Sequence, residues 1–374
     1  MSWLINSIYY IVPFIVLLGI LVFVHEFGHY LIAKLCGVKV DEFSLGFGKQ
    51  LWGRRDASGT LWKISAVPLG GYCKFVGDSD AASGGSETST LSEEDKKYAF
   101  ATQSPFKKLA IAVGGPGFNY LFAFLIFVGI FMTMGAMNFP PVVGEVIKGG
   151  AAEKAGILPQ DRILTINGKQ IKTFQNIRQE VEMAADGFVD IELMRGEQKI
   201  NKKIKLEKIP LEVENNQEER PMLGVTSVPT AEFGQGRLSF VEAVKEAGVR
   251  TWRVTELTLR GVGQMISGRR STDDVGGIVR IAEMTGDISK SNSWMDFLVF
   301  MSLLSINLGL INLFPIPLLD GGHVVIYLIE IVTRREINEQ VKEYIFKLGF
   351  FLLIALMVFA TYNDIARLFN RWFS

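Results

Sequence analysis

Residues 4–35 read LINSIYYIVPFIVLLGILVFVHEFGHYLIAKL, an apolar stretch that ends in a cluster of ionisable side chains. Residues 1–25 contain no Lys, Arg, Asp or Glu. About 20 consecutive apolar residues are enough for a helix to cross the hydrocarbon core of a bilayer. A signal peptide would begin with basic residues, whereas no basic residue precedes this apolar run. We therefore predict a membrane-spanning helix over residues 4–35.

His25, Glu26 and His29, near the end of this span, form the pattern H-E-x-x-H. The i, i+4 spacing places both imidazoles on one helix face, where they can hold one Zn²⁺ with Glu26 beside them as general base. Ionisable side chains inside an apolar span are costly and are functional by default. The alternative is a pair of histidines that only satisfy hydrogen bonds at a helix end.

A catalytic zinc needs a third protein ligand and an open position for water. Residues 312–323 read NLFPIPLLDGGH and supply two candidates. The two prolines break a helix at membrane depth, which is tolerated only where the backbone is buried in protein or lines a wet cavity. Asp320 is the preferred ligand and His323 its rival. The alternative for Asp320 is an ordinary helix-end cap, and for His323 a polar interface residue.

Three more charge-free stretches, residues 109–144, 297–319 and 348–363, predict further spans. The fold class is thus a multi-span α-helical membrane protein with about four transmembrane helices. Basic residues near span ends mark the cytoplasmic side, which places both termini and residues 138–295 outside. Those basic residues are Lys34, Lys39, Lys107, Lys108, Arg334, Arg335, Lys342 and Lys347; Arg367 and Arg371 argue mildly against this orientation.

The overall composition excludes several classes of protein. The chain has 39 basic and 39 acidic side chains, so no bulk charge favours nucleic acid. Two cysteines exclude a disulfide scaffold and cysteine-rich zinc modules. Hydrophobic residues make up 48% and charged residues 21%, which is too apolar for intrinsic disorder. All three histidines fall in the two membrane motifs.

These motifs resemble those of the site-2 protease family of intramembrane zinc metalloproteases, in its bacterial regulator-of-sigma-E protease branch. The resemblance implies that His25, His29 and Asp320 are zinc ligands and that Glu26 is the general base on zinc-bound water. It places Asn312 near the substrate or the oxyanion. The matching stretches are HEFGH at 25–29, PLGGY at 68–72, GGPGFN at 114–119, with Gly115 where Ala is more usual, and NLFPIPLLDG at 312–321.

Residues 41–75 alternate apolar and polar side chains between glycine turns, which predicts short β-strands. They could form a small soluble hairpin. The family resemblance instead implies a membrane-re-entrant β-loop that pairs with extended substrate, because a helical substrate hides its peptide bonds until it is unwound. The candidate substrate-pairing residues are Gly46, Phe47, Gly48, Gly70 and Gly71. Residues 76–100 are rich in Ser, Gly, Asp and Glu and predict a flexible linker.

Residues 142–209 have the composition of a soluble α+β domain. The pattern predicts strands over 143–146, 161–169, 189–194 and 199–206, and helices over 151–157 and 174–185. Together they resemble a PDZ domain of the permuted bacterial protease type, in one copy, with Gln160 in place of the usual Gly. Such a domain could bind an extended chain at a sheet edge, or it could only block the access of substrates sterically. Residues 238–292 contain amphipathic helical patterns that could lie on the outer membrane surface or simply pack.

The predicted division of the chain therefore has seven segments. They are 1–36, the first transmembrane helix with H-E-x-x-H; 37–104, the cytoplasmic or re-entrant β-loop and linker; 105–137, the second transmembrane helix; 138–210, a periplasmic PDZ domain; 211–294, a periplasmic linker with amphipathic helices; 295–333, the third transmembrane helix with the L-D-G motif; and 334–374, a cytoplasmic loop and the fourth transmembrane helix.

The favoured function is zinc-dependent endoproteolysis within transmembrane segments of single-span membrane proteins. The resemblance implies anti-sigma factors or remnant signal peptides as substrates, in regulated intramembrane proteolysis. It implies location in a bacterial inner membrane, with the active site toward the cytoplasm. One rival is a membrane-anchored scaffold whose zinc is structural or absent. A second is a metal transporter that uses the same His and Asp residues.

Overall fold

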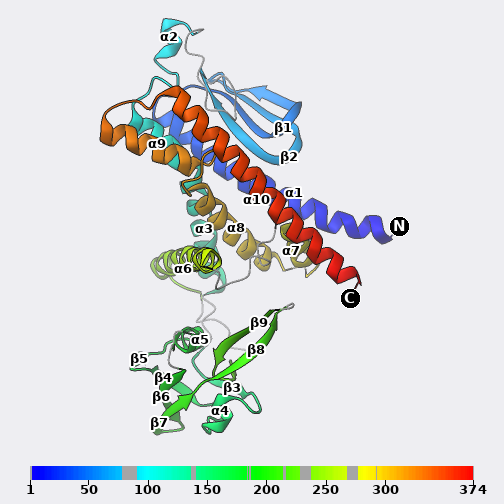
Figure 1. Cartoon of the computed structure of the whole chain (residues 1–374), viewed down its shortest axis with the longest axis vertical. Coiled ribbons are helices and arrows are strands. Elements are labelled where there is room, and N and C mark those ends of the chain that lie inside the picture. Colours follow the sequence, from blue (N-terminus) through cyan, green and yellow to red (C-terminus); the bar gives the residue numbers. More distant parts are fainter. Residues whose placement is uncertain are drawn as a thin grey trace. The chain divides into compact units, whose positions relative to one another are not determined.

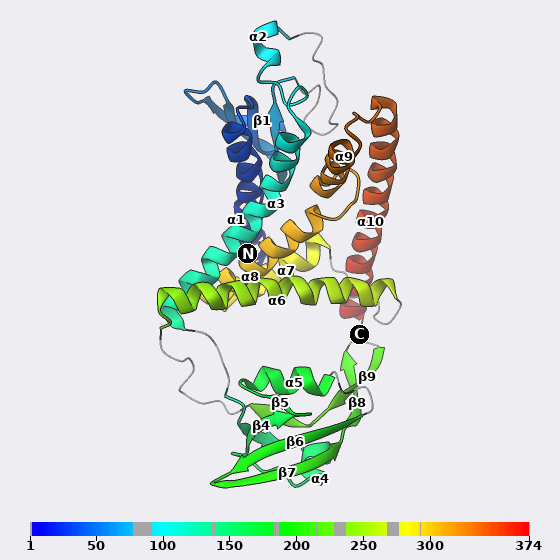
Figure 2. The same cartoon turned by 90° about the vertical axis from the view of Figure 1, so that its left-hand side faces the viewer.

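The computed structural model describes residues 2–77, 91–135, 140–182, 184, 187–213, 216–227, 237–267, 277–291 and 293–373. The chain divides into two compact units. One unit contains residues 1–129 and 244–374, and the other contains residues 130–243. Figures 1 and 2 show the elements of both units from perpendicular directions.

The first unit is mainly helical. Its helices are α1 (Ser2–Leu35), α2 (Glu93–Lys96), α3 (Pro105–Met134), α6 (Phe240–Ile266), α7 (Ile278–Lys290), α8 (Trp294–Asn312), α9 (Asp320–Thr333) and α10 (Glu339–Phe373), although α3 and α6 each extend past the unit boundary. Figure 2 shows α6 running across the direction of α3 and α10. Helices α6 and α7 account for the amphipathic patterns predicted in 238–292.

Within the described residues, three helical segments are long and apolar enough to cross a membrane: Tyr9–Leu35, Pro105–Met134 and Trp294–Asn312. They match the first three predicted spans. The third helix ends earlier than predicted, at Asn312 rather than residue 319, because the two-proline segment leaves the helix. The fourth predicted span, residues 348–363, lies within α10 and stays a prediction.

Helices α1 and α3 approach closely where two glycines face each other. A Cβ added at Gly28 would overlap the carbonyl group of Gly114 and lie 2.8 Å from Phe118 Cβ. A Cβ added at Gly114 would lie 2.9 Å from the carbonyl oxygen of Gly28. Small residues at such crossings let helix backbones meet in a membrane, where packing drives association. The crossing brings α3 against the part of α1 that carries H-E-x-x-H.

Strands β1 (Val40–Arg55) and β2 (Leu61–Phe75) form an antiparallel hairpin. The strands predicted in residues 41–75 are confirmed, and they are longer than expected. The first half of β1 has partners on both sides, since Phe43 pairs with both Cys73 and Trp62. The hairpin therefore folds back on itself, with the start of β1 between the two halves of β2. Of the predicted linker 76–100, residues 78–90 lie outside the described residues.

Asp56 organises the tight turn between these strands. Its carboxylate accepts hydrogen bonds from the backbone amides of Ser58 (2.8 Å) and Thr60 (3.0 Å) and from Trp62 Nε1 (3.0 Å). The hydroxyl of Tyr30 on α1 also donates to Asp56, at 3.2 Å. One side chain thus closes the turn and attaches it to the end of α1 beyond the H-E-x-x-H motif.

The second unit contains a four-stranded sheet in the order β5-β4-β6-β7. Strand β3 pairs with β10, and β8 pairs with β9. The elements are β3 (Val143–Val146), α4 (Ala151–Lys154), β4 (Arg162–Ile166), β5 (Lys169–Gln170), α5 (Phe174–Glu182), β6 (Phe188–Arg195), β7 (Gln198–Lys205), β8 (Glu207–Val213), β9 (Asn216–Met222) and β10 (Val225–Ser227).

The strands and helices predicted between 143 and 206 are all present, although residues 183, 185 and 186 of the predicted helix lie outside the described residues. Strands β8, β9 and β10 fall in residues 211–294 or at their border, where the sequence indicated a linker and helices. Strand β9 reads NQEERPM, so it lacks the apolar alternation by which strands are recognised. The sheet core is apolar and alternating, as in Val189, Ile191 and Leu193 of β6.

Gln160 has a left-handed backbone with φ of 71°. This conformation favours Gly, because a Cβ crowds the following carbonyl oxygen. A Gly at the first position of the pattern G-D-x-I-x-x-I-N-G would adopt this conformation without strain, whereas Gln160 adopts it with local strain. The amide of Gln160 still donates to the Val143 carbonyl, at 2.8 Å.

Asp161 is buried beside this turn. Its carboxylate accepts hydrogen bonds from Arg195 Nε and Nη2, both at 2.7 Å, and from the Leu158 amide at 2.9 Å. Burial alone would raise the pKa of Asp161, but the bonds from Arg195 and Leu158 outweigh it and hold the pKa below its usual range. A depressed pKa means that the ionised carboxylate stabilises the folded unit above the unfolded-state pKa.

We expect Asp161→Asn to lower the local stability of this unit at pH 7 by about 2 kcal/mol, the contribution typical of hydrogen bonds to a charged group. The difference from the unaltered protein should shrink below about pH 4, where the unfolded carboxyl binds a proton. Hydrogen exchange of peptides from β4 and β6, corrected for intrinsic rates, measures both effects in the full chain. Glu197→Gln, in the exposed β6–β7 turn, is the control and should show neither; equal protection in the two variants would contradict the prediction.

Candidate metal centre

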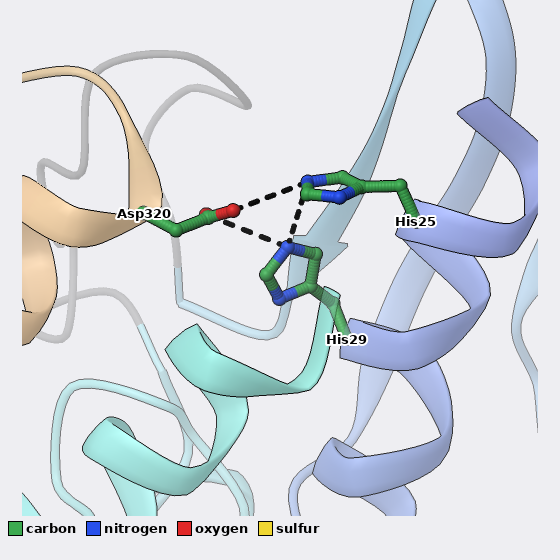
Figure 3. A group of neighbouring side chains, drawn as sticks. All are labelled: His25, His29 and Asp320. Atoms are coloured by element: carbon green, nitrogen blue, oxygen red, sulfur yellow. Dashed lines mark hydrogen bonds and ion pairs between the residues drawn. The ribbon is translucent and has the colours of Figure 1, made fainter. Parts of the chain in front are cut away.

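Three side chains from two distant parts of the chain converge in the helical unit. His25 and His29 lie on α1, one turn apart, and Asp320 is the first residue of α9. Figure 3 shows the two imidazoles and the carboxylate pointing toward one another. Their candidate ligand atoms all lie within 4.8 Å of one another.

The separations match those of ligands around one zinc ion. His25 Nε2 lies 3.1 Å from Asp320 Oδ2, His29 Nε2 lies 3.4 Å from Asp320 Oδ1, and the two Nε2 atoms are 3.3 Å apart. Tetrahedral nitrogen and oxygen ligands at zinc lie about 2.0–2.2 Å from the ion, which places them about 3.4 Å from each other. The donor set of two imidazoles and one carboxylate suits catalytic zinc.

A buried carboxylate oxygen supports the same fit. Among the described residues, Asp320 Oδ2 is buried and makes no hydrogen bond, although His25 Nε2 is 3.1 Å away. A buried charged oxygen without a donor is costly unless it is paired or coordinates a metal. The three side chains can therefore hold a divalent cation, and a cation would remove that cost.

The outer nitrogen of each imidazole also has a neighbour. His29 Nδ1 lies 2.8 Å from the carbonyl oxygen of Ile111 in α3. A carbonyl only accepts, so His29 Nδ1 carries the proton, and in the neutral imidazole Nε2 then has the lone pair that can bind a metal. His25 Nδ1 lies 3.0 Å from the side-chain amide of Asn119, also in α3. Helix α3 thus supports both histidines from behind.

The backbone between α8 and α9 presents Asp320 from a tight, strained loop. Leu318 has a left-handed backbone with φ of 77°, a strained conformation that persists only where its surroundings hold it in place. A Cβ added at Gly321 would overlap the carbonyl groups of Leu313 and Phe314, and one at Gly322 would lie 2.6 Å from the Ile316 carbonyl oxygen. The glycines after Asp320 let the loop lie directly on the start of α9.

Glu26 lies beside the hairpin. A Cβ added at Gly71 would lie 3.2 Å from Glu26 Cγ and 2.7 Å from the Ser44 carbonyl oxygen. Gly70, with φ of 133°, packs against the ring of Phe47. Strand β2 therefore touches α1 at the predicted general base, and the side chain of Phe47 is 43% exposed.

The remaining predicted loop residues lie in the same bend. Gly46 and Gly48 have φ of 87° and 84°, both in the left-handed region. A Cβ added at Gly46 would lie 2.7 Å from the Val67 carbonyl oxygen, whereas one at Gly48 would meet nothing within 4 Å. At position 46 a side chain would collide with the neighbouring strand. At position 48 there is space for a side chain, and glycine is favoured by the left-handed backbone alone.

Two other predicted residues lie outside the ligand group. His323, the rival ligand, packs its ring against Phe346 and Tyr327, with centroids 4.9 Å and 6.1 Å away. Within the described residues, the ligand group consists of His25, His29 and Asp320. Asn312 is the last residue of α8 and is half-buried; its approach to substrate stays a prediction.

Sequence reasoning gave no role to two residues that touch the centre. The first is Asn119, which closes the quoted GGPGFN stretch. The second is Gly115, where a Cβ would overlap the His29 imidazole. Both lie on the face of α3 that meets α1. The helical spacing of these residues from Gly114 shows that they share a face of α3. It shows that this face meets α1 only after the contact between Gly114 and Gly28 is known.

Comparison with known proteins decides the family. The sequence profile of peptidase family M50 matches residues 13–356.

The chain belongs to peptidase family M50.

Curated relatives agree with this assignment over almost their whole length. The chain is 38% identical to a relative from Agrobacterium fabrum over 367 residues, 96% of each chain, and 38% identical to one from Rhizobium meliloti over 379 residues, 99% of this chain and 100% of the relative. It is 35% identical to one from Campylobacter jejuni over 361 residues, 96% of this chain and 93% of the relative. All three are named "Putative zinc metalloprotease". The M50 chain is a zinc metalloprotease, and its apolar helices suit a membrane protein.

We expect Gly28→Ala to destabilise this M50 protease by about 1–3 kcal/mol, the usual cost of overpacking, and to reduce its zinc content. The new methyl group would push α3, with its support for both histidines, away from α1. Thermal unfolding in detergent and metal analysis measure the two effects. Gly19→Ala, in the same helix, adds a Cβ with nothing within 4 Å and should change neither; identical behaviour of the two variants would count against the close crossing.

Proposed function

We propose that this M50 protease cleaves a peptide bond within or near the transmembrane segment of a single-span membrane protein. In this proposal His25, His29 and Asp320 hold the zinc and Glu26 moves the proton. The convergence of two imidazoles and a buried carboxylate oxygen at the end of an apolar span is the observation that carries it. Ionisable groups in such a segment are expensive to keep without a function.

The chemistry follows from the placement of the side chains. When bound, zinc supplies Lewis acidity to the scissile carbonyl group. Glu26 removes a proton from the attacking water while the water oxygen bonds to the carbonyl carbon. The carbon–nitrogen bond then breaks, and Glu26 returns the proton to the leaving amine nitrogen. Asn312 is assigned as a donor to the oxyanion or as a substrate contact.

The hairpin is suited to hold an extended substrate. A transmembrane helix keeps its peptide bonds inside the helix, so it must unwind before hydrolysis. Pairing with a strand edge stabilises the unwound form through backbone hydrogen bonds. Gly71 of β2 lies against Glu26, so a substrate strand added beside this part of the hairpin would pass close to the base. We assign Gly46, Phe47, Gly48, Gly70 and Gly71 to this pairing.

Substrate selection belongs to the second unit in this proposal. The elements predicted between 143 and 206 are present and enclose an apolar core that also includes Leu223, which supports a PDZ domain at 138–210. The lysine and arginine pattern supports a periplasmic position for it, with the active site toward the cytoplasm of a bacterial inner membrane. There it would act as a filter that delays cleavage until the substrate's outer domain has been trimmed. Anti-sigma factors and remnant signal peptides are the proposed substrates.

We expect Glu26→Gln to keep its zinc but to lose cleavage of a model membrane substrate in detergent by about 10²–10⁴-fold, because general base catalysis is worth that much. Glu94→Gln, in an exposed turn of helix α2, is the control and should cleave normally. Full activity of Glu26→Gln would refute the role of the base. A folded protein without metal would favour the scaffold, and zinc flux into liposomes that is independent of Glu26 would favour the transporter.

A further inference from the structure

The two histidines differ in what supports their outer nitrogens. His29 Nδ1 faces a backbone carbonyl oxygen, which leaves no choice of proton position. His25 Nδ1 faces the side-chain amide of Asn119, with Nδ2 3.0 Å away. An amide can present either its nitrogen, which donates, or its oxygen, which accepts. The proton position on His25 therefore depends on how this one amide is turned.

Only one orientation of the amide leaves His25 ready to bind a metal through Nε2. A neutral imidazole has one N–H and one lone pair. If Asn119 donates, the Nδ1 lone pair is used and Nε2 carries the proton. If the Asn119 oxygen accepts, Nδ1 carries the proton and the Nε2 lone pair faces Asp320. Since Nε2 is the atom 3.1 Å from the Asp320 carboxylate, the second arrangement is the one that coordination requires.

A second observation at the same residue points the same way. Asn119 is fully buried, and its Oδ1 atom makes no hydrogen bond among the described residues. Buried polar atoms in folded proteins are normally paired. Turning the amide by half a turn exchanges the positions of its nitrogen and its oxygen. That turn gives the oxygen a donor, the N–H at His25 Nδ1, and moves the NH₂ group to the position that the oxygen leaves.

Helix α8 holds Asn119 in place for this role. Ser305 Oγ donates to the backbone carbonyl of Asn119 at 2.8 Å, and both residues are fully buried. One turn along α8, a Cβ added at Gly309 would lie 3.0 Å from the Pro116 carbonyl oxygen and 3.2 Å from Asn119 Cβ. The close crossing of α8 on α3 thus leaves this turn of α3 little freedom to move.

We propose that Asn119 is a positioning residue that selects the ligand nitrogen of His25, by accepting a hydrogen bond from Nδ1–H through its side-chain oxygen. The proposal rests on the proposed zinc ligands. Partners of this kind fix the orientation of a metal-binding histidine and raise its basicity, and their loss typically lowers metal affinity about 10–100-fold. Ser305 acts through Asn119 and belongs to the same support.

Zinc affinity of the full-length protein in detergent, measured by competition with a chromogenic chelator, tests the proposal. Asn119→Leu keeps the volume but removes the oxygen, and its affinity should fall about 10–100-fold. Asn119→Asp keeps an accepting oxygen and should bind zinc at least as tightly as the unaltered protein. The visible absorption of the Co²⁺-loaded protein should change in Asn119→Leu and be preserved in Asn119→Asp.

A matched control separates this role from packing. Asn307 on α8 accepts a hydrogen bond from Thr258 Oγ1 at 2.8 Å and is not part of the ligand group. Asn307→Leu removes a comparable amide and should leave zinc affinity unchanged. An equal loss in Asn307→Leu, or no loss in Asn119→Leu, overturns the proposal. If Asn119→Leu does not fold, as judged by its thermal unfolding, Asn119→Ala makes the same comparison.

His25→Ala distinguishes the two levels of the argument. If it abolishes tight zinc binding while Asn119→Leu has no effect, the zinc ligands stand and only the role of Asn119 is wrong. If His25→Ala binds zinc as tightly as the unaltered protein, the ligand set of the proposed function is itself wrong, and the role of Asn119 falls with it.

Discussion

Two imidazoles and one carboxylate meet near the end of an apolar helix, and the rest of this structure depends on that contact. In an aqueous protein such groups could be hydrated, but at membrane depth they must be satisfied by protein or by metal. Each imidazole then needs a hydrogen-bond partner for the ring nitrogen that points away from the carboxylate. The chain supplies these from α3, at Ile111 for one histidine and Asn119 for the other. The helices thus pack around this polar group as well as around apolar clusters such as that of Leu17, Leu21 and Phe300.

Glycine is what makes this arrangement possible, because the backbones must come closer than side chains allow. Gly28 and Gly114 bring α1 and α3 together, and Gly309 brings α8 onto α3. Gly321 and Gly322 let the strained loop lie on the start of α9. Gly71 lets strand β2 reach Glu26. The helix contacts among these replace side-chain volume with direct backbone approach, as expected where packing rather than water drives association.

Much of this could be predicted from the sequence, and the limits have physical causes. Charge-free length identified the three apolar helices, and the spacing of His25 and His29 indicated a shared metal. Proline and glycine around Asp320 indicated the loop, because they act on the local backbone. The contact of Asn119 with His25 could not be predicted, since it depends on the angle at which α3 crosses α1. Strand β9 was missed because its polar residues carry no alternation.

The three members of the ligand group lie at opposite ends of the chain, with His25 and His29 in its first helix and Asp320 in its ninth. A ribosome therefore completes the histidine pair long before it reaches the carboxylate. Helix α8, which carries Ser305, also emerges late. A partly synthesised chain has the two imidazoles and Asn119 of α3, but it has neither the carboxylate nor the Ser305 hydroxyl that bonds to Asn119. If these three residues hold the zinc, a chain that ends before residue 320 lacks one of its ligands, and the centre is complete only after α9 has been made.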